Sequence, residues 1–520
     1  MNLQRTTSVF VALLLSVFLL AIPIGAGGGY EVITDFKYRL FLLICGGYIA
    51  AVALIRLQLA VTGIQPVRNL KKQLLALHPA LKLILLFWLF VIVSAIASPH
   101  PGVFVGQFWQ EGVLSISIYI VSCFFLAKYV TPQKWMLFLL AVSALLFSLL
   151  SLMQLTGANP FTLYPPGHNF YGAGIYYSGK FIGTIGNAGL SATFLSLAVG
   201  VLSMATIKFE FKERWWIAIA LLAGLLLIFE MGVYAAMVAV VIGMLLMLPV
   251  AVNSRRTLSN TLIVLSVYLF SFLLSQLLLF GDGYLRFGAF SIWLLLVLLI
   301  LIALAVITKK CDMFDNIAAR NYRIAAIIFS IAAIFGILLF VLLQDREYGG
   351  MIYEASQFMR GRADDSFGTR RIYIWRNMLE HMSWNTLLFG TGPDTLGHWA
   401  IPPFSRYFPE LGRTLTSTID AAHNEYLHIL AMNGLFAFLA YTGALVVAAV
   451  KWYKTPENHL SAVAGAGMLF YCIQAFFGIS HFITAPFFWT CFAILIYSQT
   501  NWKYTSKHNG GSKDESTIKS

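Results

Sequence analysis

Long apolar runs, separated by short polar stretches, recur along most of the chain. Runs of about 18 or more apolar residues are long enough to cross a bilayer as α-helices. The pattern predicts candidate spans at residues 8–26, 39–61, 81–98, 112–130, 135–155, 186–206, 215–230, 232–252, 259–280, 289–307, 323–343, 424–449, 460–479 and 485–499. We therefore expect an all-α polytopic transmembrane protein with about 12 to 14 spans.

The composition supports this interpretation. Of the 520 residues, 59% are hydrophobic and only 11% are charged. A soluble domain carries about a quarter of its residues as Asp, Glu, Lys or Arg. So little charge cannot cover a water-facing surface of this size, which excludes an ordinary soluble domain and predicts an outer surface in contact with lipid.

The positions of the basic residues predict the orientation. With the N-terminus in the cytoplasm, Lys and Arg gather in the cytoplasmic loops and in the C-terminal tail, as the positive-inside rule requires. The net charge of +13 then reports topology, and no nucleic-acid partner is expected. The first apolar run is typical either of a signal peptide or of a retained first span, and we expect retention because a multispanning chain needs no cleaved signal.

These patterns divide the chain into five parts. We expect N-terminal transmembrane helices over 1–180, central transmembrane helices over 181–343, a large extracytoplasmic loop over 344–422 and C-terminal transmembrane helices over 423–503. Residues 504–520 are polar and are predicted to be a disordered cytoplasmic tail. The five cysteines form no CxxC pair, so we expect small buried side chains and not a zinc site or disulfides.

The large loop has an unusual composition, since its basic residues other than histidine are all arginines. Guanidinium groups match phosphate oxygens in pairs, although a solvated mixed-charge loop explains the same composition. Within it, Ile372, Trp375, Leu379 and Met382 recur at helical spacing and predict an amphipathic helix lying on the outer leaflet, ended by the Gly390-Thr391-Gly392-Pro393 turn. A second exterior stretch, Gly157 to Lys180, is rich in Gly, Pro and Tyr and suits contact with sugars or lipid headgroups.

Three candidate functional features lie together at the predicted outer face. They are FIGTIGNAGLSA (181–192) with Asn187, the pair Arg370-Arg371 followed by Trp375, and the HNEYL segment that begins at His423 and Asn424. Ionisable residues at the head of a span are candidates for function. Structural roles remain open for each, namely helix packing at Asn187 and a helix start at His423.

The order of FxGTxGN, a tight exterior turn, a long exterior loop with RxxxW and GxGP, and HNEYLHILAxNGLFAFLAY resembles the O-antigen ligase and O-antigen polymerase superfamily, over roughly Phe181 to Tyr441. The resemblance implies transfer of a glycan from an undecaprenyl-diphosphate carrier to a hydroxyl of a glycan, lipid or protein acceptor, at the outer face of the bacterial plasma membrane. It also implies a GT-C-like fold, contact with membrane lipids, and an inverting reaction without metal or cofactor.

The resemblance also implies roles for individual residues. Arg371 matches the loop arginine of the family and would hold the donor diphosphate, with Arg370 and Lys180 assisting. His423 matches the family's histidine and would accept the proton of the acceptor hydroxyl or orient that hydroxyl. Supporting roles would fall to the following residues: Asn187, Asn424, Trp375 and Glu230.

One position departs from the family pattern. Many members carry Ser-Arg-Gly at the tight turn, where this chain reads Glu230-Met231-Gly232. The missing arginine is replaced by another cation (Lys180, Arg286, Arg360 or Arg362), or the donor or acceptor differs, or the activity is lost. Glu230 itself is a candidate general base, sugar-binding acceptor or interfacial residue.

Other functional classes also fit a polytopic chain. A transporter or flippase of lipid-linked sugars usually places ionisable residues near mid-membrane, often within inverted repeats, and neither feature is evident here. A cell-wall polymerase of the shape-and-division type would also have many spans and a large exterior loop. A catalytically inactive scaffold would account for the missing Ser-Arg-Gly. The sequence does not separate ligase from polymerase.

Overall fold

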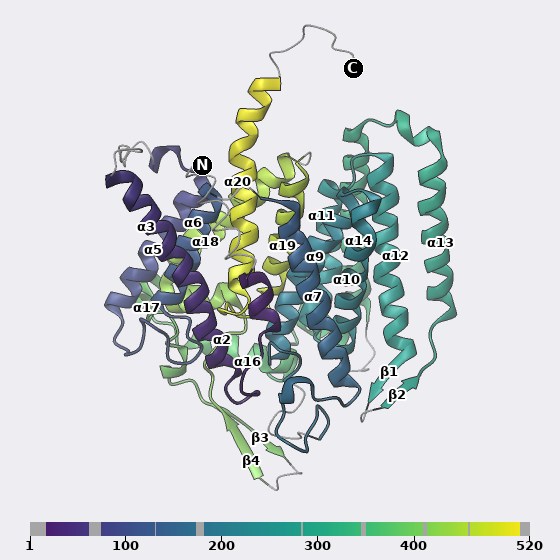
Figure 1. Cartoon of the computed structure of the whole chain (residues 1–520). Coiled ribbons are helices and arrows are strands. Elements are labelled where there is room, and N and C mark those ends of the chain that lie inside the picture. Colours follow the sequence, from purple (N-terminus) through teal and green to yellow (C-terminus); the bar gives the residue numbers. More distant parts are fainter. Residues whose placement is uncertain are drawn as a thin grey trace.

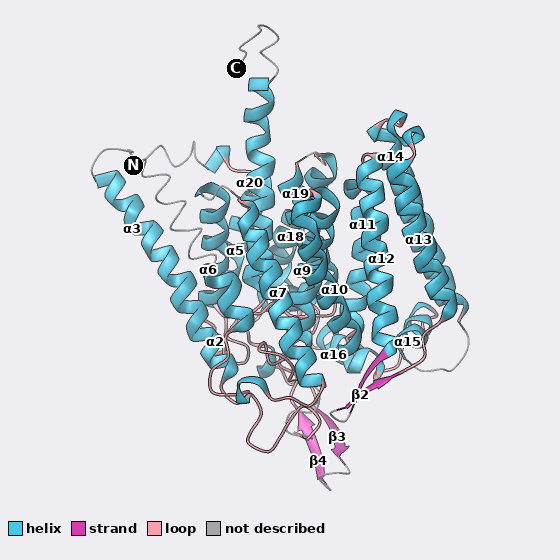
Figure 2. Ribbon diagram, turned by 45° about the vertical axis from the view of Figure 1, so that its right-hand side comes forward, coloured by secondary structure: helices cyan, strands magenta, loops and turns pink. Residues whose placement is uncertain are grey.

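The computed structural model describes residues 17–61, 74–129, 132–172, 181–281, 284–344, 350–408, 413–455 and 458–509. Its long helices run side by side as a bundle (Figures 1 and 2). They are α2 (Ile33–Phe41), α3 (Gly47–Val61), α5 (Pro79–Ala97), α6 (Val113–Tyr129), α7 (Lys134–Leu155), α9 (Ala188–Lys208), α10 (Phe211–Met231), α11 (Tyr234–Ala251), α12 (Arg255–Leu277), α13 (Ile292–Lys310), α14 (Ala319–Leu343), α18 (Glu425–Lys454), α19 (His459–Gln474) and α20 (Ala485–Asn509). A π-helical turn, η1 (Leu42–Gly46), joins α2 to α3.

The helical pattern confirms the predicted fold class. Within the described ranges, nine helices are long and apolar enough to cross a membrane, and three shorter apolar helices accompany them. Each predicted span from 39–61 onward coincides with a helix. Of the first predicted span, residues 17–24 are helical, and 1–16 lie outside the described residues.

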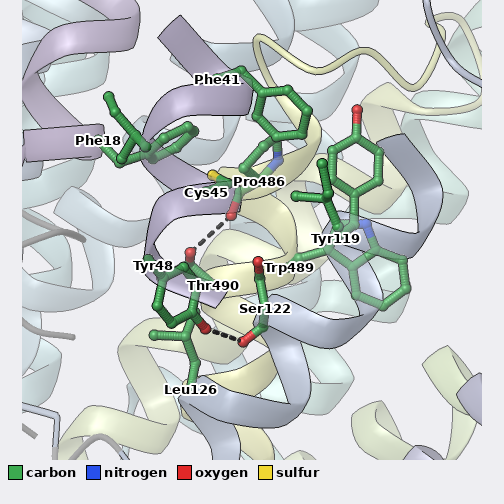
Figure 3. Close-up of a pocket in the computed structure, with 12 residues that line it drawn as sticks. Phe18, Phe41, Cys45, Tyr48, Tyr119, Ser122, Leu126, Pro486, Trp489 and Thr490 are labelled. Atoms are coloured by element: carbon green, nitrogen blue, oxygen red, sulfur yellow. Dashed lines mark hydrogen bonds between the residues drawn. The ribbon is translucent and has the colours of Figure 1, made fainter. Parts of the chain in front are cut away.

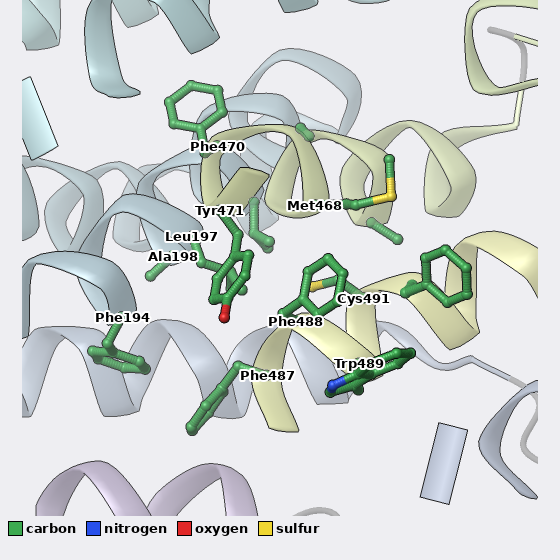
Figure 4. Close-up of a cluster of buried hydrophobic side chains, with 14 of the residues drawn as sticks. Phe194, Leu197, Ala198, Met468, Phe470, Tyr471, Phe487, Phe488, Trp489 and Cys491 are labelled. Atoms are coloured by element: carbon green, nitrogen blue, oxygen red, sulfur yellow. The ribbon is translucent and has the colours of Figure 1, made fainter. Parts of the chain in front are cut away.

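Helix α9 forms the centre of the bundle and is buried along its whole apolar length. It packs against α10 and α19, and α20 packs against α19 and also reaches α9. Figure 4 shows how aromatic rings from these helices fill the interior, with Phe194 of α9, Tyr471 of α19 and Phe488 of α20 among them. Tyr471 and Phe488 are stacked with ring centroids 4.6 Å apart. Close van der Waals packing of this kind drives helix association where lipid replaces water.

The smaller elements gather mainly at one end of the bundle, opposite the C-terminal end of α20 (Figures 1 and 2). There lie α15 (Gly350–Met359), α16 (Phe367–Glu380), α17 (Trp384–Phe389) and the 3-10 turns η2 (Pro160–Thr162) and η4 (Leu396–His398), while η3 (Asp312–Asn316) joins α13 to α14 at the other end. Two antiparallel hairpins also lie at the first end. Strand β1 (Leu278–Gly281) pairs with β2 (Tyr284–Phe287), and β3 (Phe404–Phe408) pairs with β4 (Arg413–Ser417).

Predicted and observed boundaries differ at several helices, and three of these differences bear on the fold. Helix α12 ends at Leu277, because residues 278–281 pair with 284–287 as the first hairpin and do not continue the predicted span. Helix α19 ends at Gln474, and residues 475–484 are irregular up to the start of α20. Helix α20 continues through Asn509 into the predicted tail, and residues 510–520 lie outside the described part.

The predicted amphipathic helix exists as α16, but its buried face differs. Ile374 and Met378 are buried, whereas Leu379 is exposed. The helix ends at Glu380, so the Gly390 turn ends the next helix, α17. Residues of the loop and of α18 cover the Ile374 and Met378 face of α16 with a small apolar cluster. The placement of α16 on the outer leaflet stays a prediction.

Candidate functional site

Arg371 begins the regular part of α16, after a left-handed turn. Gly368, Thr369 and Arg370 have φ angles of +60°, +55° and +69°. For Thr369 and Arg370 this conformation costs roughly 1–2 kcal/mol each. The Glu354 carboxylate accepts a 2.9 Å hydrogen bond from the Gly368 amide and helps to fix the turn. Strained backbone of this kind is concentrated at functional sites.

The turn holds the Arg371 guanidinium in a defined orientation. Its Nη1 donates to the carbonyl of Gly368 (2.7 Å) and to the Thr369 hydroxyl (2.8 Å), while Nη2 donates to the carbonyl of Phe477 (3.1 Å). Its Nε is buried and has no hydrogen-bond partner within the described part of the chain. Burial lowers the pKa of Arg371, yet a guanidinium stays charged. The group is therefore an oriented cation with a donor left for a ligand.

Arg370 has a different partner from Arg371. Its guanidinium carbon lies 5.0 Å from the centre of the Phe404 ring on β3, which is a cation–π contact. The structure thus directs the two neighbouring arginines to different elements, Arg371 to the 475–484 segment and Arg370 to the second hairpin.

Trp375 connects α16 to the segment that holds His423. One helical turn after Arg371, its indole Nε1 donates a 2.8 Å hydrogen bond to the carbonyl of Ala422. The next residue, His423, is half-buried and has a φ of +47°, another left-handed conformation outside glycine. The hydrogen bond of Trp375 joins α16, which carries Arg371, to the segment before α18, which carries His423. We call the place where these two segments meet the junction.

Asn424 and Asn187 have structural roles at helix starts. Asn424 is the N-cap of α18 and accepts a hydrogen bond from Leu427 N at 3.0 Å, and Asn187 caps α9 in the same way through Leu190 N at 3.1 Å. These bonds satisfy amides that a helix start leaves without partners. The Glu425 amide donates to the carbonyl of Ala475 at 2.8 Å, which ties the start of α18 to the irregular 475–484 segment.

The GxGP turn packs against a break in α18. Gly434 has a non-helical conformation inside α18 (φ +85°), and a Cβ there would lie 2.3 Å from the carbonyl oxygen of Leu388. A Cβ on Gly390 would lie 2.1 Å from the carbonyl oxygen of Met432. The two glycines therefore permit a backbone-to-backbone contact, and this explains why GxGP and the glycine after HNEYL occur as a set.

A buried polar group next to this junction was not predicted. The loop 98–112, between α5 and α6, is fastened by Asp394, whose Oδ2 accepts from the amides of Phe108 (3.0 Å) and Trp109 (2.8 Å). Glu111 is buried, and its carboxyl accepts from the Tyr119 hydroxyl (2.5 Å) and from the Ser480 hydroxyl (3.3 Å). Glu111 thus contacts the same 475–484 segment that accepts the hydrogen bond of Arg371.

The environment of these acids raises their pKa values. Burial, reinforced by the nearby Asp394 and Glu425 carboxyls, raises the pKa of Glu111 to about 8. Burial also raises the pKa of Asp394 and of Asp420, and each of the two has hydrogen bonds that oppose the shift. Burial lowers the pKa of His481 to about 3, so its imidazole is neutral at physiological pH. Nothing in the local sequence of the Gly-rich loop around Glu111 indicates that its carboxyl is buried near other acids.

Two further predicted candidates, Glu230 and Arg360, lie next to the ends of α10 and α14. Glu230 lies at the end of α10, just before Gly232 reverses the chain, and its Oε1 is buried without a partner among the described residues. Arg360, a candidate to replace the missing family arginine, donates to the carbonyl of Leu342 (2.7 Å) at the end of α14. Lys180 and the side chain of Arg286 lie outside the described part.

An apolar cavity lies between helices of the bundle (Figure 3). Tyr119, which donates to Glu111, also lines this cavity together with residues of α6, α20 and the π-helical region. The lining residues are Phe18, Phe41, Ile44, Cys45, Tyr48, Ile118, Tyr119, Ser122, Leu126, Pro486, Trp489 and Thr490. Its walls are mainly apolar and carry no charged group.

Comparison with known families agrees with the motifs. Residues 277–442 match the family model described as O-Antigen ligase, a stretch that contains Arg371, Trp375 and His423. The match confirms the predicted resemblance, and it leaves the FxGTxGN segment outside the matched region. No curated protein matches the chain.

Proposed function

We propose that this chain is a member of the O-antigen ligase and polymerase superfamily and transfers glycan from an undecaprenyl-diphosphate-linked donor to an acceptor hydroxyl at the outer face of a bacterial plasma membrane. Arg371 holds the donor diphosphate, and His423 accepts the proton of the acceptor hydroxyl. The reaction needs no strong acid from the protein, because a diphosphate is already a good leaving group. Catalysis then rests on positioning and on stabilising charge.

The hydrogen bond from Trp375 to Ala422 carries this proposal. It connects the helix that presents Arg371 with the residue next to His423. The bond from Arg371 to Phe477 and the bond from Glu425 to Ala475 tie both sides to the irregular 475–484 segment. Irregular backbone near a membrane is tolerated where it is buried in protein or lines a cavity, which supports a site at this place.

The proposed chemistry is a single displacement. The acceptor oxygen attacks the anomeric carbon, and its proton passes to an imidazole nitrogen of His423. The bond between the anomeric carbon and the diphosphate oxygen breaks, and the charge that develops on the diphosphate is stabilised by Arg371. Attack from the side opposite the leaving group inverts the anomeric centre.

The distribution of charge supports the proposed orientation. Arg255, Arg256, Lys309 and Lys310 lie at helix ends opposite the large loop. Basic residues mark the cytoplasmic side of membrane proteins. The end that carries α16 and His423 is then extracytoplasmic, where lipid-linked glycans are assembled by the family that the chain resembles.

Lipid analysis of a strain that lacks this protein tests the proposal. Long glycan chains accumulating on the undecaprenyl-diphosphate carrier would show a ligase that cannot unload its donor, and accumulating single repeat units would show a polymerase. Donor retained on the inner leaflet would instead favour a flippase. An unchanged pool of lipid-linked glycan would contradict glycosyl transfer altogether.

A further inference from the structure

Four basic side chains surround Phe209 at the end of the bundle opposite the large loop; we call them the Phe209 cluster: Lys134, Lys208, Arg256 and His459. Lys134 Nζ lies 5.4 Å from the centre of the Phe209 ring, and the His459 ring centre lies 6.3 Å from it. Arg256 Nη2 donates to the carbonyl of Phe209 at 3.1 Å. Lys208, Arg256 and Lys134 all act electrostatically on His459, so the four groups share one small region.

Lys208 is the buried member of the Phe209 cluster. The residue is only 3% exposed, and its Nζ makes no hydrogen bond to any described residue. A nearby acceptor is already engaged, because the carbonyl of Ile207 accepts from the Asn260 amide at 2.8 Å. A buried ammonium without a partner is costly, and buried charges in proteins are ordinarily paired. The other three members of the cluster are exposed, so the buried amine lies beneath an accessible basic rim.

The surrounding charges also favour an anion. Helices α7, α12 and α19 all begin here, at Lys134, Arg255 and His459, and helix N-termini carry partial positive charge. The Glu210 carboxylate pairs with Arg256 at 3.8 Å and is largely exposed, so solvent screens it. Asp312 and Asp315 pair with Arg255, outside the cluster.

Aromatic residues indicate which anion fits. Trp135 follows Lys134 and is exposed, and Trp215 is exposed in the first turns of α10. Tryptophan is enriched at the depth of the lipid headgroups, and basic pockets between transmembrane helices bind phosphate-bearing headgroups. We propose that the Phe209 cluster is a binding site for the phosphate of an anionic phospholipid headgroup, with Lys208 as the buried anchor and Arg256 as the fork at the rim.

Thermal unfolding and native mass spectrometry of the detergent-purified full chain test this site. The probes are phosphatidylglycerol, phosphatidylcholine and inorganic phosphate, added separately. We expect phosphatidylglycerol to raise the Tm and to remain bound, and phosphatidylcholine to do so much less. Lys208→Met should weaken retention of phosphatidylglycerol about tenfold or more. Without added lipid its Tm should equal or exceed that of the unsubstituted protein, because an unpaired buried charge is gone.

Lys310→Gln is the matched control, since it removes an exposed lysine from the same end of the bundle. It should respond to phosphatidylglycerol like the unsubstituted protein. If Lys208→Met does not fold, Arg256→Gln provides the second variant, with the same expected loss. A Tm rise from inorganic phosphate alone, lost in Lys208→Met, would support the site and assign it to soluble phosphate compounds. Equal lipid retention by all variants would overturn the proposal.

Discussion

The indole of Trp375 donates a 2.8 Å hydrogen bond to the carbonyl of Ala422, across 47 positions of sequence. Trp375 lies one helical turn after Arg371, and Ala422 precedes His423. This bond therefore connects the helix of the proposed diphosphate-binding arginine with the residue next to the proposed proton acceptor. It predicts that the two groups lose their mutual placement when the indole N–H is removed.

Trp375→Phe keeps an aromatic ring but removes the donor. We expect glycan transfer to fall roughly ten- to a hundredfold, because a small misplacement of reacting groups is enough for such a loss. Membrane insertion and Tm should change little, since one hydrogen bond contributes about 1 kcal/mol. Trp384→Phe is the control, as that side chain on α17 is 79% exposed. Equal transfer by both variants would remove the assigned role of Trp375.

Arg371→Lys keeps the positive charge but removes the planar guanidinium group with its several donors. Three hydrogen bonds orient the guanidinium, and an ammonium cannot reproduce their geometry. Transfer by purified enzyme should fall by about 10² or more, in line with the loss of an oriented charge-stabilising donor. Arg376→Lys, on the same helix with an exposed pair to Asp365, should retain transfer. A fully active Arg371→Lys would show that charge alone suffices there.

The raised pKa of Glu111 predicts a pH-dependent stability. In the folded state the carboxyl holds its proton up to about pH 8, whereas an unfolded glutamate loses it near its ordinary value of 4.5. The folded state therefore binds more protons between these values, and this group's contribution to stability falls as pH rises through the window. Each pKa unit corresponds to about 1.4 kcal/mol.

Glu111→Gln should make the Tm less dependent on pH, with its largest gain relative to the unsubstituted protein at and above pH 8. Its amide is neutral, and its carbonyl oxygen can still accept from Tyr119. The measurement is a set of melting curves from pH 5 to 9 for both proteins. Parallel Tm profiles would show that Glu111 is not held protonated by its surroundings.

Asn424 is expected to act as a helix cap and not as a chemical group. Asn424→Ala should destabilise the protein by about 1 kcal/mol, as loss of an N-cap typically does. Asn424→Ser restores a capping oxygen and should restore both Tm and transfer. Loss of transfer in Asn424→Ser with an unchanged Tm would instead indicate a direct role at the site.

The helices were predictable because a long apolar run has few alternatives to a membrane span. Boundaries failed where the chain leaves helical structure without a strong polar signal. The segment from Ala475 to Thr484 is still apolar, so hydropathy extends the helix, although Gly478 and the bonds to Arg371 and Glu425 require irregular backbone. The same limit hid the first hairpin, which begins within the apolar run after Leu277.

The site was predictable only in part. Arg371 and His423 follow from motifs, yet their connection through Trp375 and Ala422 depends on tertiary placement. Asn187 and Asn424 cap helices, a role that the local sequence of an asparagine does not distinguish from that of a ligand, and their supporting roles at the site stay predictions. Glu111 was missed, since its burial is created by segments more than 300 residues away, such as that of Ser480.

The most direct test of the account uses purified His423→Ala reconstituted in liposomes with an undecaprenyl-diphosphate-linked glycan and an acceptor. We predict that the variant inserts normally and still binds the donor through Arg371, but forms no transfer product, whereas the unsubstituted protein does. Transfer by His423→Ala at the unsubstituted rate would contradict the proposal that His423 receives the acceptor's proton at this junction.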